Sequence, residues 1–489
     1  MTVDTAVDVA VVRLGGGVTL ANPAADAVTG AVATNTITCS AIVNAGGESI
    51  IDCAVRFIDP YNVAAMDVVR FAGGATAARM GKLSAGPSRV LAGDITITAD
   101  FDVIDASADY WCVTNASRFT AGKLKKNDAP GSVNGEQPNF RICEGGYAHF
   151  TSITSGRDRM AVSVQGELEV DDWYDTMSVK DTKNNNTFAG DFGYPGDEAF
   201  SGSTVRAGGI RRRKYSTYSA YVDWMTYCYP ANWYIGSDGI QLEYKAFPIE
   251  FAGCQKYIYA TADFTISGYS TAESSDKADW GVGCAADTTL DTQGHTVTWN
   301  AGAVLRNNIT FTKAGEGTLV MEPYGAKISD GTPSVVVAGG TLEARACTIG
   351  TDMDPLFGAS VPVTVKNGAT LRIASGVTTV SNAVTLEEGA TLAVDAIDER
   401  DALASSTGPL TATGRAKVKI TGTLPDSVFS TGTNFVIAAS CDAATLANIS
   451  LDKSGLEFAT AGKCSNARLD VVDGKLVVSV KPYFYIKVR

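Results

Sequence analysis

One short phrase recurs in the C-terminal half of the chain and constrains the fold more than any other feature. Its leucines follow one another at intervals of 23, 29 and 21 residues. Repeats of this length are typical of stacked supersecondary units, each of which buries its apolar face against its neighbours. The four copies are GEGTLVM at 315–321, AGGTLEA at 338–344, NGATLRI at 367–373 and EGATLAV at 388–394, with Leu319, Leu342, Leu371 and Leu392 as the repeated leucine.

Each copy combines a turn with a strand. Glycine permits a sharp corner, and the following Thr-Leu-x-apolar sequence alternates outward and inward side chains as a strand does. A second strand precedes several copies, as in 333–344, 361–373 and 382–394. We therefore predict an all-β, right-handed parallel β-helix (β-solenoid) with longer loops in the middle of the chain. A β-sandwich array is the alternative, but its hairpins would place turn signals every 8–12 residues. The predicted repeat corners are Gly317, Gly340, Gly368 and Gly389.

The first half of the chain also shows internal similarity. The sequence TADF occurs at 98–101 and again at 261–264, 163 positions later. This favours one repetitive body over two unrelated domains, with a weak helix signal only at 399–406. We predict N-terminal β-helix coils over 1–130, a loop-rich and aromatic-rich β-helix section over 131–260, the β-strand repeats over 261–395, and C-terminal β coils with a cap over 396–489.

Composition excludes several classes of protein. No run reaches the 18 apolar residues of a membrane-spanning helix, and a net charge of −13 argues against nucleic-acid binding. The chain has two histidines, His149 and His295, which lie too far apart in sequence for a HExxH zinc motif. We assign neither histidine a role, and we expect no metal and no cofactor.

The compartment is predicted from weaker signals. The first 14 residues lack the basic and apolar segments of a secretory signal, although the rest of the sequence is typical of an extracellular or cell-surface protein. We expect that a signal peptide has been removed; the alternative is export by another route. The ten cysteines contain no CxxC motif, which excludes zinc-ribbon and thioredoxin-like patterns. Disulfides between some of them and buried thiols in others both stay open.

The stretch 287–321, followed by VVVAGGTLEA at 335–344, resembles the autotransporter-associated β-strand repeat. The resemblance covers roughly 285–395. It implies a bacterial surface or secreted protein with a parallel β-helix body, of the passenger type used for adhesion and display. The outer-membrane barrel that often follows such passengers has no counterpart after 395. The segment 473–489 instead predicts a terminal strand pair, either a cap or a docking segment.

The sharpest charged feature lies in the aromatic-rich section. A basic run beside tyrosines can grip an anionic glycan, with aromatic faces stacking on sugars; the alternatives are a solvated basic strand and buried aromatic stacks. The candidate binding residues are Arg211, Arg212, Arg213, Lys214, Tyr215, Tyr218, Tyr221, Trp224 and Trp233.

We predict no catalytic residues. Three carboxylate pairs, Asp171 with Asp172, Asp197 with Glu198, and Asp352 with Asp354, are interpreted as solvated loops. Adjacent residues on an extended strand point to opposite faces, which separates Asp171 from Asp172. A polysaccharide lyase or glycosidase remains open, since many β-helices work with such pairs.

Together these features predict a structural or adhesive β-solenoid scaffold that presents binding loops. One alternative is a carbohydrate-active or carbohydrate-binding β-helix protein, and another is a subunit of a self-assembling extracellular filament. The expected partners are cell-surface or extracellular glycans and further copies of the chain itself.

Overall fold

The fold was obtained as a computed structural model of the whole chain. The structure describes residues 7–14, 18–21, 28–29, 36–52, 54–57, 89–97, 101–103, 111–126, 140–154, 162–180, 187–189, 197–213, 226–243, 249–268, 281–322, 326–328, 331–345, 361–374, 382–395, 407–460 and 462–482. These residues form two compact units, Met1–Lys256 and Tyr257–Arg489. Both are rich in β-strands that pair mostly in parallel.

The first unit is built on one long parallel ladder. Its elements are β1 (Val7–Leu14), β2 (Thr19–Ala21), β3 (Thr36–Asp52), β4 (Ala54–Phe57), β5 (Arg89–Ile97), β6 (Phe101–Val103), β7 (Trp111–Val113), β8 (Arg118–Lys126), β9 (Phe140–Ile142), β10 (Tyr147–Thr154), β11 (Val162–Val164), β12 (Glu167–Lys180), β13 (Thr187–Ala189), the 3₁₀ turn η1 (Asp197–Ala199), β14 (Thr204–Arg213), β15 (Thr226–Cys228), β16 (Asn232–Leu242) and β17 (Ile249–Phe251).

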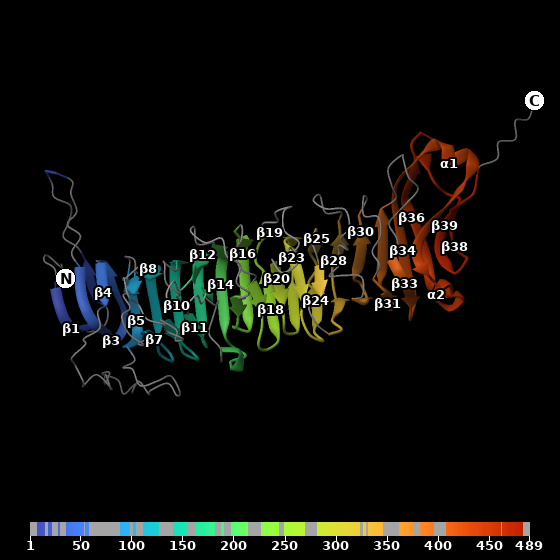
Figure 1. Cartoon of the computed structure of the whole chain (residues 1–489). Helices are drawn as coiled ribbons and strands as arrows, with labels where there is room; N and C mark the ends of the chain where they lie inside the picture. Colours follow the sequence, from blue (N-terminus) through green and yellow to red (C-terminus); the bar gives the residue numbers. More distant parts are fainter. Residues whose placement is uncertain are drawn as a thin grey trace, which may run out of the picture. The chain divides into compact units, whose positions relative to one another are not determined.

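The main ladder of this unit runs β1–β3–β5–β8–β10–β12–β14–β16. A second parallel ladder runs β5–β7–β9–β11. Figure 1 shows these strands following one another in chain order, from blue to green. A chain that returns to the same ladder after each excursion is compatible with a β-helix, because parallel neighbours require a crossover between them.

The second unit repeats this pairing with shorter strands. Its repeat strands are β19 (Phe264–Ser267), β20 (Gly281–Cys284), β21 (Thr288–Asp291), β22 (Thr296–Asn300), β23 (Gly302–Leu305), β24 (Thr310–Ala314), β25 (Thr318–Met321), β26 (Ala326–Ile328), β27 (Ser334–Val337), β28 (Thr341–Ala344), β29 (Val363–Val365), β30 (Thr370–Ile373), β31 (Val384–Leu386), β32 (Thr391–Asp395), β33 (Thr407–Ala412) and β34 (Ala416–Leu424), while β18 (Lys256–Ala260) spans the division between the units.

Three parallel ladders hold these strands. They are β21–β24–β27–β29–β31–β33, β19–β22–β25–β28–β30–β32–β34 and β20–β23–β26. The prediction of an all-β chain with parallel strands is therefore confirmed.

The leucines of the recurring phrase lie on top of one another. Leu342 pairs with Leu319 on one side and with Leu371 on the other, and Leu371 pairs with Leu392. All four are fully buried. The threonine before each leucine is only half-buried, since successive side chains on a strand point to opposite faces. This confirms that each phrase is one repeat stacked on the next.

The predicted corners differ in how they need glycine. Gly368 and Gly389 have φ angles of 75° and 80°, a conformation that L side chains rarely adopt. Gly317 is required by space instead, because a Cβ there would lie 1.9 Å from the carbonyl oxygen of His295. Gly340 combines both reasons, with a φ of 59° and a carbonyl of Gly317 2.3 Å from the added Cβ.

Lys313 occupies an inward position in an otherwise apolar column. It pairs with Leu290 on one side and Val337 on the other, and its side chain is fully buried. Its Nζ donates to Thr292 Oγ1 at 3.0 Å and to backbone carbonyls at 2.6–2.8 Å. Burial lowers the pKa of the Lys313 ammonium to about 8. The ammonium thus joins the corners of successive repeats, and its carbonyl acceptors belong to Gly315, Gly317 and Gly339.

Pairing becomes antiparallel at the C-terminal end. The elements there are α1 (Asp426–Thr431), β35 (Thr433–Ser440), α2 (Ala443–Asn448), β36 (Ile449–Phe458), β37 (Gly462–Lys463), β38 (Ala467–Val472) and β39 (Lys475–Val480). Strand β39 pairs antiparallel with both β35 and β38. The strand expected within 473–489 is therefore present as β39, whereas residues 483–489 lie outside the described residues, and the cap remains a prediction.

The two short helices were not predicted. The carboxylate of Asp442 accepts a hydrogen bond from Thr445 N at 2.7 Å and so caps α2, an N-cap pattern visible in the sequence. The helix candidate at 399–406 lies outside the described residues. Helices of six residues carry too little periodicity to be recognised from sequence.

One pair of cysteines lies in contact inside the first unit. Cys112 in β7 and Cys143 after β9 are both buried, and their Sγ atoms are 2.7 Å apart. The hydrogen bond to Cys143 and burial raise the pKa of the Cys112 thiol. Strands β7 and β9 are neighbours in one ladder, so a bond from Cys112 in β7 to Cys143, which directly follows β9, would join adjacent repeats.

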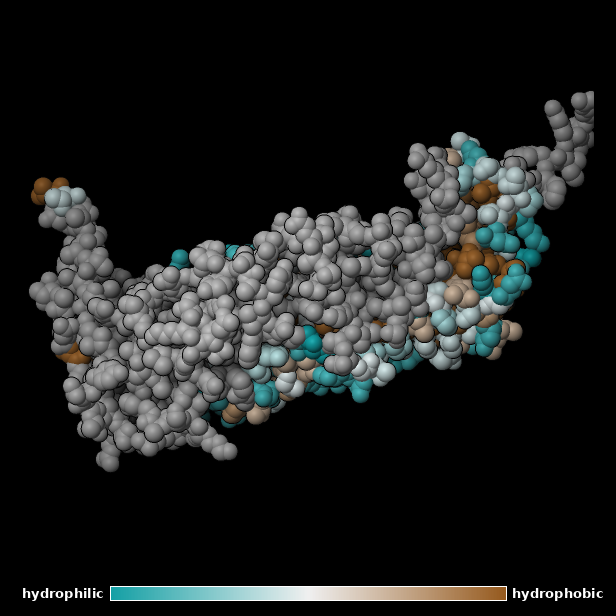
Figure 2. Space-filling model, viewed as in Figure 1, coloured by the Kyte–Doolittle hydropathy of each residue, from teal (hydrophilic) through white to brown (hydrophobic). Residues whose placement is uncertain are grey.

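The described surface is mixed in polarity. Figure 2 shows hydrophilic and hydrophobic side chains side by side over the C-terminal elements. Among the residues whose burial is described, the large apolar side chains that are exposed are Val9, Val28 and Val472. In the described part of the chain, no helix has the length and apolar character needed to cross a membrane.

Candidate functional site

The outward side of the main ladder in the first unit carries two rows of polar and aromatic side chains. Inward residues between them, such as Phe119, Leu168 and Trp233, are fully buried, so alternation directs their neighbours outward. Strand register aligns Arg118, Tyr147 and Glu167 in one row and His149, Glu169, Arg206 and Tyr234 in the next. Together with Asp171, we call these residues the charged face.

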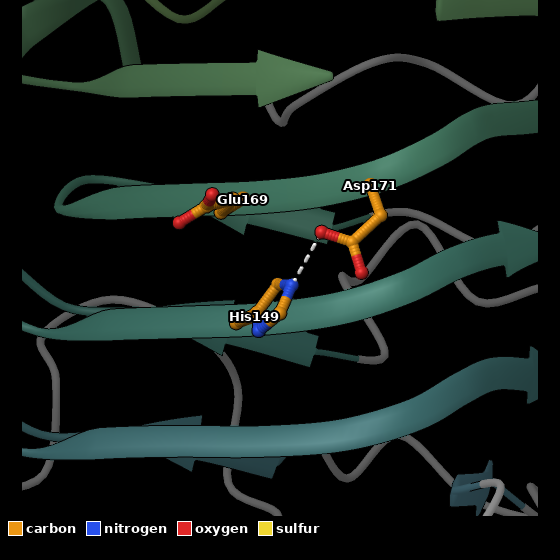
Figure 3. A group of neighbouring side chains, drawn as sticks. All are labelled: His149, Glu169 and Asp171. Atoms are coloured by element: carbon orange, nitrogen blue, oxygen red, sulfur yellow. Dashed lines mark hydrogen bonds and ion pairs between the residues drawn. The ribbon is translucent and has the colours of Figure 1, made fainter. Parts of the chain in front are cut away.

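Three residues of the charged face lie close together (Figure 3). His149 comes from β10, whereas Glu169 and Asp171 come from the neighbouring strand β12. His149 Nε2 lies 2.7 Å from Asp171 Oδ1, and one ligand atom from each of the three residues lies within 4.8 Å of the others. His149 and Glu169 are half-buried, and Asp171 is exposed. An imidazole nitrogen and two carboxylate oxygens thus converge at a surface that solvent reaches, and these are donors that could hold a metal ion.

Tyr147 orients one of the carboxylates. Its Oη donates to Glu169 Oε2 at 2.5 Å, and the guanidinium of Arg118 lies 4.0 Å from the centre of its ring. Burial and the hydrogen bond to Glu169 raise the pKa of the Tyr147 phenol, so the phenol stays protonated and acts as a donor.

Arg206 is held on the other side of the cluster. Its Nε donates to Glu167 Oε1 at 2.6 Å, and its guanidinium lies 3.9 Å from the ring centre of Tyr234. The hydrogen bond to Glu167 raises the pKa of the Arg206 guanidinium. The positive charge of Arg206 is therefore balanced by Glu167, although the residue that pairs with Arg206 in the ladder is Glu169.

A bulge directs Asp171 and Asp172 outward together. The register of β12 shifts against β14 between Val170 and Trp173, and both aspartates are exposed. Gly208 allows the backbone of β14 to lie close to the bulge of β12, because a Cβ at this position would be 2.4 Å from Asp171 O. This corrects the expectation that the two aspartates point to opposite faces: a bulge adds a residue and re-aims the side chains around it.

A second predicted carboxylate has a structural role. Asp197 was interpreted as part of a solvated loop, but it is buried in η1. It accepts hydrogen bonds from Ser163 Oγ at 2.6 Å and from Val164 N at 2.7 Å. The carboxylate thus ties η1 to β11. Asp352 and Asp354 lie outside the described residues.

The basic and aromatic candidates separate in the structure. Arg211 is half-buried, with its guanidinium 4.7 Å from the ring centre of Trp173. Arg212 and Trp233 are fully buried, and Trp233 packs edge-on against Phe251. Burial removes these two side chains from the predicted binding surface. Arg213 ends β14, but its side chain is not among those described, and Lys214, Tyr215, Tyr218, Tyr221 and Trp224 lie outside the described residues.

The cluster of His149, Glu169 and Asp171 was missed because no short motif contains it. The sequence feature that could have indicated it is a spacing: His149 and Glu169 are 20 residues apart. This equals the length of the repeat at this place, since Tyr147 pairs with Glu167 in the ladder. Among the described residues, the other histidine, His295, has one carboxylate within ion-pair distance: its Nδ1 lies 3.5 Å from Asp263 Oδ1.

Comparisons of the chain with protein-family models, curated proteins and solved structures find no match.

Proposed function

We propose that the protein is a right-handed parallel β-helix that acts as an extracellular or cell-surface structural scaffold, of the passenger type that the β-strand repeat resembles. The observation that carries this proposal is the continuity of the parallel ladder β25–β28–β30–β32–β34, to which each successive repeat contributes one strand. Such a body is built from nearest-neighbour interfaces, so it gains rigidity with each added repeat.

Charged side chains reinforce the stacking on the outside. Glu343 of β28 is bound by Arg345 and, from the next repeat, by Arg372 at 3.0 Å. Arg372 reaches on to Asp395 of the following repeat at 2.8 Å. This network crosses three successive repeats. The Glu343 side chain is only 5% exposed, so its carboxylate depends on the two guanidinium groups for its compensating charge.

The test of the scaffold combines protease resistance with location. Peptides from the ladder strands, such as those of 281–322 and 361–374, should survive a digestion that fully cleaves the urea-unfolded chain. In intact producing cells, or in their medium, protease added outside should reach the protein. A protein that is degraded uniformly would contradict the scaffold, and one that becomes accessible only after cell lysis would contradict the extracellular assignment.

A second candidate function is glycan binding, which the charged face favours. Half-buried Tyr147 and Tyr234 lie on the same outward surface as Glu167, Glu169 and Arg206. Aromatic rings and paired charges of this kind are used to bind sugars, although arginines already stack on both tyrosines here. A glycan array probed with the wild-type chain and with Tyr234→Ala tests this function. Binding that is absent, or that the substitution leaves unchanged, would contradict it.

A further inference from the structure

We propose that His149, Glu169 and Asp171 form a binding site for one divalent transition-metal ion. The inference is independent of the proposed scaffold function. It starts from the geometry in Figure 3, in which one imidazole nitrogen and two carboxylate oxygens, supplied by adjacent strands, lie within 4.8 Å of one another. The parallel pairing of β10 with β12 sets His149 directly opposite Glu169, and Asp171 follows two residues later.

The donor set selects the class of ion. Imidazole together with carboxylate suits Zn²⁺ and the neighbouring first-row ions, whereas Ca²⁺ takes six to eight oxygen ligands and Mg²⁺ keeps a shell of oxygens. Three protein ligands leave positions for water, an arrangement found in open zinc sites. The site therefore favours Zn²⁺ or Co²⁺ over Ca²⁺.

The distances require one small adjustment. With bonds of about 2.1 Å, two ligand atoms on one ion lie at most about 4.2 Å apart. His149 Nε2 and Asp171 Oδ1 already meet this limit at 2.7 Å. The ligand atoms that involve Glu169 lie within 4.8 Å of one another, so a shift of at most about 0.6 Å brings its carboxylate within this limit, which the torsions of its side chain allow. A bound ion would replace the present contact between His149 and Asp171 with two metal bonds.

Neighbouring residues support the ligands without competing for them. Tyr147 donates to Glu169 Oε2, and such outer hydrogen bonds orient metal ligands. The nearest cation in register is Arg206, whose Nε is engaged by Glu167. The two ligand carboxylates on β12 thus keep a local negative field that a divalent cation would neutralise.

The experiment uses the fact that the chain has two histidines. The full chain, labelled with ¹³C-histidine and stripped with a chelator, is titrated with Zn²⁺ and followed by nuclear magnetic resonance. We expect the ring signal of His149 to shift at a lower Zn²⁺ concentration than that of His295, which has one carboxylate neighbour. The same concentration of Ca²⁺ should leave the His149 signal in place.

Two ligand variants and two matched controls complete the test. Asp171→Asn and Glu169→Gln should each weaken Zn²⁺ binding at His149 at least about tenfold. Asp172→Asn, at the exposed neighbour of Asp171, and His295→Ala should keep the affinity within about threefold. Thermal unfolding of each variant shows that it is folded, which is expected because the ligands lie on the surface.

Three results would overturn the site. The first is a Zn²⁺ titration in which His149 and His295 respond together. The second is a loss of affinity in Asp172→Asn as large as that in Asp171→Asn, which would indicate a diffuse acidic surface. The third is no shift of the His149 signal up to millimolar Zn²⁺.

Discussion

Replacing Lys313 by methionine tests how the corners of successive repeats are joined. Methionine keeps an unbranched side chain of similar length in the column between Leu290 and Val337, but it removes the ammonium that donates to Thr292 Oγ1 and to three carbonyls. Of these carbonyls, that of Gly317 also accepts from Thr341 N, so it keeps a partner after the substitution.

The expected loss follows from these contacts. A buried acceptor left without its donor costs about 1–3 kcal/mol. The hydrogen bonds to Gly315 O and Gly339 O are part-buried, so the loss of these two acceptor contacts and of that to the buried Thr292 Oγ1 should cost about 1 kcal/mol each. The apolar thioether in an apolar column recovers about 1–2 kcal/mol. We therefore expect Lys313→Met to lower the free energy of unfolding by about 1–2 kcal/mol at pH 7.

The effect of Lys313 should depend on pH. Burial lowers the pKa of this ammonium from 10.5 in the unfolded chain to about 8. Between these two pH values the unfolded chain binds more protons than the folded chain. The contribution of Lys313 to the free energy of unfolding therefore rises between pH 8 and pH 10.5, by at most about 1.4 kcal/mol per pH unit. This gain is lost when the pH falls through 8. The difference in stability between the wild-type chain and Lys313→Met should therefore widen above pH 8.

Urea denaturation at pH 7, 8, 9 and 10 measures the difference, and hydrogen exchange of peptides covering 313–318 and 338–341 locates it. Lys366→Met is the control, because the half-exposed Lys366 pairs with Glu387 on the surface and should contribute less than about 1 kcal/mol. The reasoning would be refuted if Lys313→Met matched Lys366→Met in stability and exchange. A difference from the wild-type chain that narrows above pH 8 would refute the lowered pKa.

Three further predictions concern covalent bonds, corners and the core. With oxidised glutathione as the oxidant, the thiols of Cys112 and Cys143 should lose two protons and two electrons and form a disulfide, because their Sγ atoms lie 2.7 Å apart; peptide mapping without reductant would contradict this if both remained thiols. Gly340→Ala should destabilise the chain by about 1–3 kcal/mol more than Gly368→Ala, since both glycines have positive φ but only the added Cβ of Gly340 meets a carbonyl, and equal melting temperatures would count against that account. Leu371→Ala should cost about 2–5 kcal/mol in urea denaturation by opening a cavity in the leucine column, and a cost below 1 kcal/mol would show that the column is not tightly packed.

The repeats were predictable because each one carries its own local signal. A glycine corner followed by Thr-Leu determines which side chains face inward, and this alternation is a property of any extended strand. The stacked positions of Leu319, Leu342, Leu371 and Leu392 follow from equal placement within each copy, even though the intervals between copies differ. Intervening residues of variable length leave the ladder unchanged.

The candidate site could not be predicted in the same way. Arg212 and Trp233 were candidates for a binding surface, with a solvated basic strand and buried aromatic stacks as the alternatives. Ladder register directs both side chains into the core, as the buried stack requires for Trp233. The outward direction of Asp171 and Asp172 depends on a bulge, which a single strand's sequence does not reveal because the bulge exists only against its partner strand.

The sequence by itself determined the β-strands, their inward and outward faces in 285–395, and the stacking of the repeated leucines, because these depend on alternation within short segments. The tertiary structure decided which residues of different repeats meet. It brought His149 to Glu169 and Asp171, Cys112 to Cys143, and Lys313 to the carbonyls of two successive corners. Each of these contacts joins residues of neighbouring repeats. Whether two such residues meet in space depends on the length of the chain between them and on the register that the ladder imposes.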